Sequence, residues 1–117
     1  MTPTLQDFKA ELFRSIAHPV RIRILELLRG AGSLTVREIQ QRLGVEPSNV
    51  SQHLAIMRGR GLLSTRREGT SIWYSVAEPQ LYAMLDAARA IFDNQLAANA
   101  KLAESAAPVN MTGAERG

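Results

Sequence analysis

The sequence predicts a single, mainly helical α+β domain, in which four helices precede a β-hairpin and one further helix follows it. Three observations support this. Apolar residues recur at helical spacing as far as Met57, hydrophobicity alternates between Leu63 and Val76, and helical spacing resumes after Pro79. A chain of 117 residues is long enough for one such domain with a modest core.

The first two helices are predicted from their start signals. Thr4 and Asp7 match a capping box, and an apolar stripe continues from there to about residue 17. His18 and Pro19 then interrupt the first helix and begin a second one, with the histidine expected as its cap and the proline at its first position. Glycines 30 and 32 are expected to end it.

The next two helices are separated by only a few residues. Thr35 and Glu38 form a second capping box, which predicts a helix over Val36–Leu43. Gly44 suits the left-handed position that closes this helix, and Pro47 suits the first position of the next one. This short connection is typical of a helix-turn-helix.

The helix that begins at Pro47 has two contrasting faces. Val50, Leu54 and Met57 have the spacing of a buried stripe. The other positions carry short or flexible hydrogen-bonding groups that suit the reading of a partner surface. These residues are Ser48, Asn49, Ser51, Gln52 and His53.

The predicted hairpin carries arginines close to its turn. Its two runs are Leu63–Arg67 and Ile72–Val76, and Arg66 with Arg67 precedes the turn, where a phosphate backbone could be contacted. Basic residues are concentrated in this half of the chain: Arg37, Arg42, Arg58, Arg60, Arg66 and Arg67 oppose only Glu38 and Glu46. GC-rich coding is an alternative explanation of the high arginine content.

The terminal helices are longer than one small core requires. The last helix keeps its apolar spacing for about four turns after Pro79, which places the domain at residues 1–104 and an expected disordered tail at 105–117. We expect a homodimer to bury the surplus apolar faces, although both helices could instead pack on their own domain. The predicted interface residues are Leu5, Phe8, Leu12, Leu81, Met84, Leu85, Ala88, Ile91 and Phe92.

Several function classes are disfavoured by what the sequence lacks. It has no cysteine, which excludes thiolate chemistry and disulfides. It has no long apolar run and no secretion signal, so we expect a cytoplasmic protein without membrane contact. Its two histidines are far apart and no glycine-rich phosphate loop occurs, so we expect no enzyme.

Two separated segments resemble one family. SIAHPVRIRILELL (Ser15–Leu28) and PSNVSQHLAIMRGRGLLSTRREGTSIWYSV (Pro47–Val76) are similar to the corresponding motifs of ArsR-type (ArsR/SmtB) bacterial winged helix-turn-helix regulators. The resemblance covers roughly Phe8–Asn94. It implies a homodimer joined through the first and last helices, with two recognition helices in successive major grooves of a palindromic operator. At matching positions it implies DNA contacts by Ser48, Asn49, Ser51, Gln52, His53, Arg66 and Arg67.

The sensing sites typical of this family are not matched. Where many metal sensors have a pattern like E-L-C-V-C-D-L, SLTVREI places Thr35 and Arg37. A second family site uses Asp, two His and Glu, and the aligned positions here hold Glu78, Gln80, Ile91 and Asn94. We therefore predict no cofactor and no metal at either site.

A non-standard site for a divalent metal stays open as an alternative. Its ligands would be His18 and His53 together with carboxylates from Asp7, Glu11, Asp86 or Asp93.

The functional prediction is a sequence-specific DNA-binding regulator that acts as a dimeric repressor. Two alternatives remain: a winged-helix protein-interaction module or co-regulator that acts through a partner protein, and a metal-responsive regulator with a non-standard site. Two roles are considered for His53: contacting bases, and positioning its helix.

Overall fold

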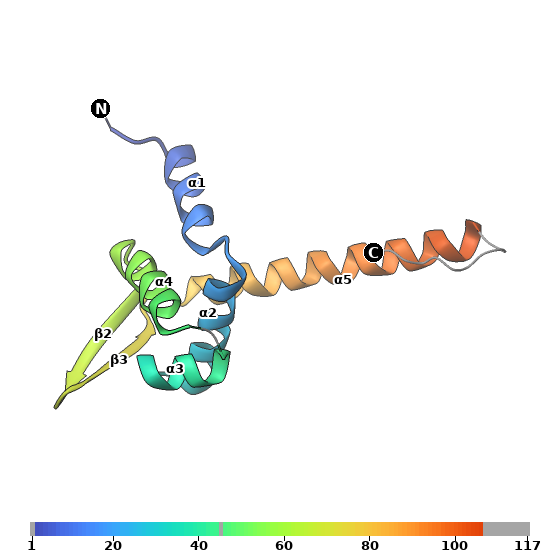
Figure 1. Ribbon diagram of the computed structural model, residues 1–117. Helices are drawn as coiled ribbons and strands as arrows, with labels where there is room; N and C mark the ends of the chain where they lie inside the picture. The colour runs from blue at the N-terminus through green and yellow to red at the C-terminus, as the bar shows by residue number, and fades with distance from the viewer. Residues whose placement is uncertain (1, 45, 107–117) are drawn as a thin grey trace. The chain divides into compact units, whose positions relative to one another are not determined.

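The computed structural model describes residues 2–44 and 46–106, which divide between a unit ending at Pro79 and a unit beginning at Gln80. The first unit contains four helices and three strands, and the second contains one long helix (Figure 1). In chain order the elements are α1 (Leu5–Ile16), α2 (Pro19–Ala31), β1 (Leu34–Thr35), α3 (Val36–Leu43), α4 (Pro47–Gly59), β2 (Leu63–Glu68), β3 (Ser71–Val76) and α5 (Gln80–Ala106).

The helix starts form as their side chains predict. Thr4 and Asp7 cap α1 reciprocally, and Thr35 and Glu38 do the same for α3. His18 caps α2 by accepting a hydrogen bond at Nδ1 from the backbone N–H two residues later, at 3.1 Å. Each cap satisfies a donor that the helix itself leaves unpaired.

The described residues on either side of the connection between α3 and α4 are also as predicted. Gly44 has φ 69° and ψ 31°, in the left-handed region that suits glycine, and its N–H bonds to the carbonyl of Gln40 at 2.8 Å. Pro47 is the first residue of α4.

One core holds the helices of the first unit together. Its fully buried side chains come from α2, α3 and α4, so α4 is anchored by two neighbouring helices. They are Ile24, Leu25, Leu28, Ile39, Val50, Leu54 and Met57.

The sheet has one strand more than predicted. The expected hairpin forms from β2 and β3, but β1 adds to the free edge of β3 to give the order β1-β3-β2. Leu34 pairs with Tyr74 and Thr35 with Trp73, both antiparallel. A two-residue strand is too short to show hydrophobic alternation, which is why the sequence pattern did not reveal it.

The second unit corrects the predicted length of the last helix. α5 has 27 residues and ends at Ala106, so Ser105 and Ala106, assigned to the tail, are helical. The last turns are rich in alanine, which favours a helix without adding an apolar stripe. The rest of the predicted tail, 107–117, lies outside the described residues. Within the described part of the chain, no helix has the length and apolarity to cross a membrane.

Candidate nucleic-acid interface

Helix α4 separates a buried face from a polar one. Val50, Leu54 and Met57 are all 0% exposed, as their spacing predicts. Around the rest of the helix, three of the predicted contact residues have exposed side chains: Asn49, Ser51 and Gln52. Ser48 lies in the first turn, but its side chain is outside the described part of the structure. The core therefore holds a helix whose free face carries amide and hydroxyl groups.

His53 is held more tightly than its neighbours on α4. It is half-buried, and its Nδ1 accepts a hydrogen bond from Nε of Arg21 at 3.0 Å. The ring of His18 lies 4.3 Å away between centroids, tilted by 48°. Burial lowers the pKa of His53, and the nearby charges of His18 and Arg21 lower it further. His53 is therefore a neutral imidazole at neutral pH.

The two arginines of the β2–β3 hairpin are held differently. Both side chains are exposed. Nε of Arg66 lies 3.3 Å from a carboxylate oxygen of Glu68, and its guanidinium lies 5.6 Å from the ring centroid of Trp73. Arg67 makes no ion pair with any other described residue. One arginine of the hairpin is thus steered by its neighbours and the other is free to meet an anion.

The C-terminal end of α4 is tied to α1 by charge. Arg60 forms an ion pair with Glu11, which also binds Arg14 at 2.9 Å. These side chains are substantially exposed, so the pairs contribute little to stability. The interaction does, however, occupy Arg60, which is less available to a partner than Arg58.

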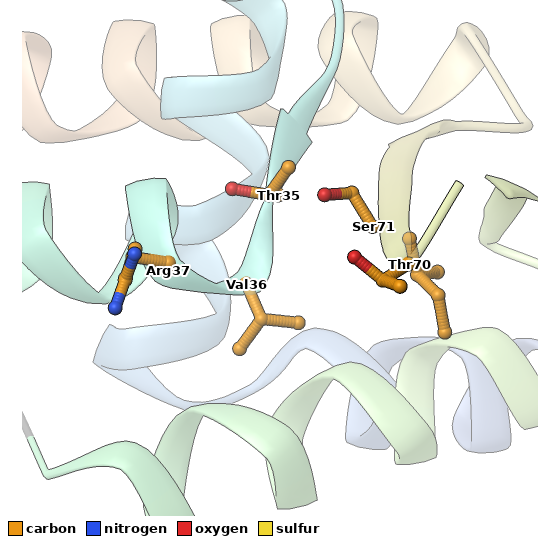
Figure 2. A pocket seen from close by; sticks show the side chains of 6 residues that line it. Thr35, Val36, Arg37, Thr70 and Ser71 are labelled. Atoms are coloured by element: carbon orange, nitrogen blue, oxygen red, sulfur yellow. The ribbon is translucent and has the colours of Figure 1, made fainter. Parts of the chain in front are cut away.

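A cavity of about 360 Å³ lies where α3 begins beside the start of β3 (Figure 2). It is lined by Thr35, Val36, Arg37, Thr70, Ser71 and Ile72. Figure 2 shows Ser71 across this space from Thr35, with Arg37 directed away from both. This is the place where the resemblance would put thiolates. The lining offers hydroxyls and a guanidinium instead, which are not ligands for soft metal ions.

At least four of the six candidate ligands for a non-standard metal site have other partners. Nδ1 of His18 and Nδ1 of His53 each accept a hydrogen bond, Asp7 caps α1, and Glu11 pairs with arginines. Across residues 2–44 and 46–106, no three histidine or acidic side chains gather as a metal site would require.

Sequence reasoning missed Arg21 as a partner of the predicted surface. Its Nη1 also donates to the backbone carbonyls of Ser15 at 3.1 Å and Arg14 at 3.4 Å. Arg21 lies three residues after His18, the residue that caps α2. The spacing places the two side chains near the start of α2, but nothing in the sequence links residue 21 to residue 53.

Comparison with known proteins identifies the family. A family model described as bacterial regulatory protein, arsR family, matches residues 18–65, which span α2 to β2. The HTH-type transcriptional regulator Rv0081 of Mycobacterium tuberculosis is 42% identical over 91 residues, covering 74% of this chain and 76% of its own length. The chain belongs to the ArsR family.

Other ArsR-family comparisons agree in sequence and in structure. The transcriptional repressor PagR of Bacillus anthracis is 41% identical over 78 residues, covering 67% of this chain and 77% of its own. The crystal structure of Rv0081 matches with a TM-score of 0.74 and 38% identity, over 85% of this chain and 99% of that one. The repressor BigR of Xylella fastidiosa matches with a TM-score of 0.68 and 30% identity, over 74% and 88%.

These findings confirm the predicted family and the mainly helical winged fold. This ArsR-family protein is a DNA-binding transcriptional regulator.

Proposed function

We propose that the protein represses transcription by binding a palindromic DNA operator as a homodimer. The observation that carries this proposal is the exposed polar face of α4, opposite a stripe that is completely buried. A helix built in this way can enter a major groove while its own domain holds it in place. The printed name of PagR as a transcriptional repressor supports repression as the outcome. A cytoplasmic location belongs to the same proposal, because the operator lies there.

The side chains of α4 divide into two kinds of contact. The exposed amides of Asn49 and Gln52 can each bond an adenine edge through two hydrogen bonds. Ser51 and Ser48 suit base edges or phosphate oxygens. In the hairpin, Arg66 and Arg67 suit the phosphate backbone, which contributes affinity rather than sequence preference. The amides of α4 are therefore the specificity determinants in this proposal.

Dimerisation through α1 and α5 is supported by large apolar side chains left exposed in the single chain. Phe8 is 61% exposed, Phe92 58% and Ile91 56%. Leu5 and Ala88 are exposed as well, and Leu12, Met84 and Leu85 are half-buried. Leu81 is 1% exposed within the single chain, so we leave it out of the proposed interface. Exposed apolar surface of this kind is typical of a protein-protein contact.

Operator binding is tested by gel-shift titration against the promoter DNA upstream of the protein's own coding sequence. We expect affinity in the nanomolar range, on the order of 10⁻⁸ M or tighter, and steep weakening as salt is raised. An unrelated duplex of equal length is the control. Equal, weak binding to both duplexes and to other candidate promoters would reject the proposal and favour a protein-interaction module.

The dimer is tested by sedimentation velocity on the whole chain. We expect two-fold mass for the native protein and dissociation for Phe8→Asp, because the substitution puts a charge into an apolar interface. Lys9→Asp, on the same helix, is the matched control and should stay dimeric. A native protein that sediments as a monomer at every concentration contradicts this part of the proposal.

A further inference from the structure

Arg21 joins three helices through one side chain. From α2, its Nε donates to Nδ1 of His53 on α4 at 3.0 Å. Its Nη1 donates to the carbonyl oxygens of Ser15 and Arg14 in the last turn of α1, at 3.1 Å and 3.4 Å. A helix leaves its last four carbonyls without an i+4 partner, and of these two only that of Arg14 also accepts a backbone bond, from the N–H of Ala17 at 3.4 Å. The planar guanidinium therefore fixes α4 relative to the end of α1.

The same contact decides which nitrogen of His53 carries the proton. The guanidinium of Arg21 stays protonated and can only donate, so Nδ1 of His53 has to be the acceptor. A neutral imidazole that accepts at Nδ1 has its single N–H at Nε2. No described residue accepts a hydrogen bond from that Nε2. The ring thus has one donor available to a partner.

The surroundings of His53 keep it in this form. The groups that act on its charge are His18, which caps α2, and Arg21 of α2, while α1 supplies the carbonyls that hold the far end of Arg21. Protonation at Nδ1 would break the bond to Arg21 and place two cations in contact.

We propose that Arg21 is a positioning residue for DNA recognition, which orients His53 so that its Nε2–H donates to an acceptor atom on DNA. This inference rests on the proposed function. The acceptor is a phosphate oxygen or a base-edge oxygen or nitrogen, and both accept the same donor.

The test compares Arg21→Gln with Arg23→Gln. Both substitutions remove one positive charge from α2, and Arg23 is exposed with only a 3.5 Å contact to the carbonyl of Leu43. Affinity is measured by fluorescence anisotropy on a duplex from the protein's own promoter and on an unrelated duplex. We expect Arg21→Gln to weaken promoter binding by about tenfold or more. Arg23→Gln should cause only a small loss, equal on both duplexes.

A second readout follows the histidine directly. Nitrogen-15 NMR of the free protein distinguishes a bare from a protonated ring nitrogen. We expect the native protein to show His53 with a bare Nδ1, and Arg21→Gln to show a tautomer mixture with a raised pKa, because the guanidinium has gone. Unchanged tautomer and pKa in Arg21→Gln, or equal promoter losses in the two variants, would overturn the proposal.

Two further variants keep the test decisive. If Arg21→Gln does not fold, Arg21→Lys retains the charge without the planar fork, and the same two measurements apply. His53→Phe removes the Nε2–H donor. A loss of affinity confined to one base-pair position indicates a base contact, and a loss shared by all sequences indicates a phosphate contact. An unchanged affinity contradicts the proposal. The NMR result stands on free protein, so a failure to bind any promoter rejects the proposed function separately.

Discussion

Helix α4 and the β2–β3 hairpin both present polar side chains, but on different supports. α4 lies on a completely buried stripe, and Arg21 holds His53 at its side. The hairpin is mostly exposed beyond its base, and of its two arginines only Arg66 has partners, Glu68 and Trp73. Sequence discrimination depends on hydrogen bonds to base edges, which need donors and acceptors held in a defined geometry, whereas attraction to phosphate carries no sequence information. The two regions are therefore expected to contribute specificity and affinity separately.

The largest effect should come from removing the support of α4. Leu54→Ala empties a site with 0% exposure and should lower the free energy of unfolding by about 2–5 kcal/mol. Ile72→Ala, in the hairpin where that side chain is 38% exposed, should cost about 0.5–1 kcal/mol. Chemical denaturation followed by circular dichroism measures both. Equal losses of unfolding free energy in the two variants would contradict the proposal that the core supports α4 more strongly than the hairpin.

The next effect concerns the exposed polar face of α4. Gln52→Ala removes an exposed amide without touching the core, so stability should be unchanged while promoter affinity falls by about 10- to 100-fold. Binding to an unrelated duplex should stay as it was. Anisotropy titrations on both duplexes provide the measurement. A loss of the same size on both would mean that Gln52 contacts phosphate rather than bases.

The hairpin should respond in the opposite way. Arg67→Ala should weaken binding to promoter and unrelated DNA alike, and should reduce the slope of log affinity against log salt by about one, as expected for one lost phosphate contact. Lys101→Ala, which removes one positive charge from α5, is the control. Promoter-specific weakening by Arg67→Ala would contradict the division between the two regions.

The smallest effect is a pH dependence of folding stability that arises from His53 on α4. The pKa of His53 is lowered below 6.5 in the folded protein, so the unfolded chain binds the proton more readily. Stability should therefore fall as pH drops from neutrality through 6.5, down to the folded pKa. Denaturation at several pH values measures this, with His53→Gln as the variant that should flatten the curve. The hairpin contains no histidine, so Arg67→Ala should leave the curve unchanged.

Local signals in the sequence predicted most of the fold. Capping pairs such as Thr35 with Glu38, the glycine at 44 and the stripe through Leu54 each act within a single helix or at its end, so their outcome follows from nearby residues. Strand β1 was not predicted, because its two residues are too few to show an alternating hydrophobic pattern. The end of α5 was predicted too early, because alanine favours a helix without forming a recognisable apolar stripe.

The candidate site was predicted less completely. The polar residues of α4 follow from helical spacing, and so do the arginines at the tip of the hairpin. The bond between Arg21 and His53 spans 32 residues and depends on how α2 packs against α4. Likewise, the pairing of Arg60 with Glu11 depends on the position of α1 beside α4. Side-chain partners across such distances come from tertiary packing, which spacing alone does not encode.

Trp73 is the only tryptophan of the chain, and it lies in β3 under the guanidinium of Arg66. Its indole emission therefore originates entirely in the hairpin, without any added label. A cation over the ring and its displacement by a phosphate would change the intensity of that emission. Tryptophan fluorescence can therefore follow the binding of DNA phosphate to the hairpin in real time, while α4, which has no tryptophan, contributes nothing to the signal.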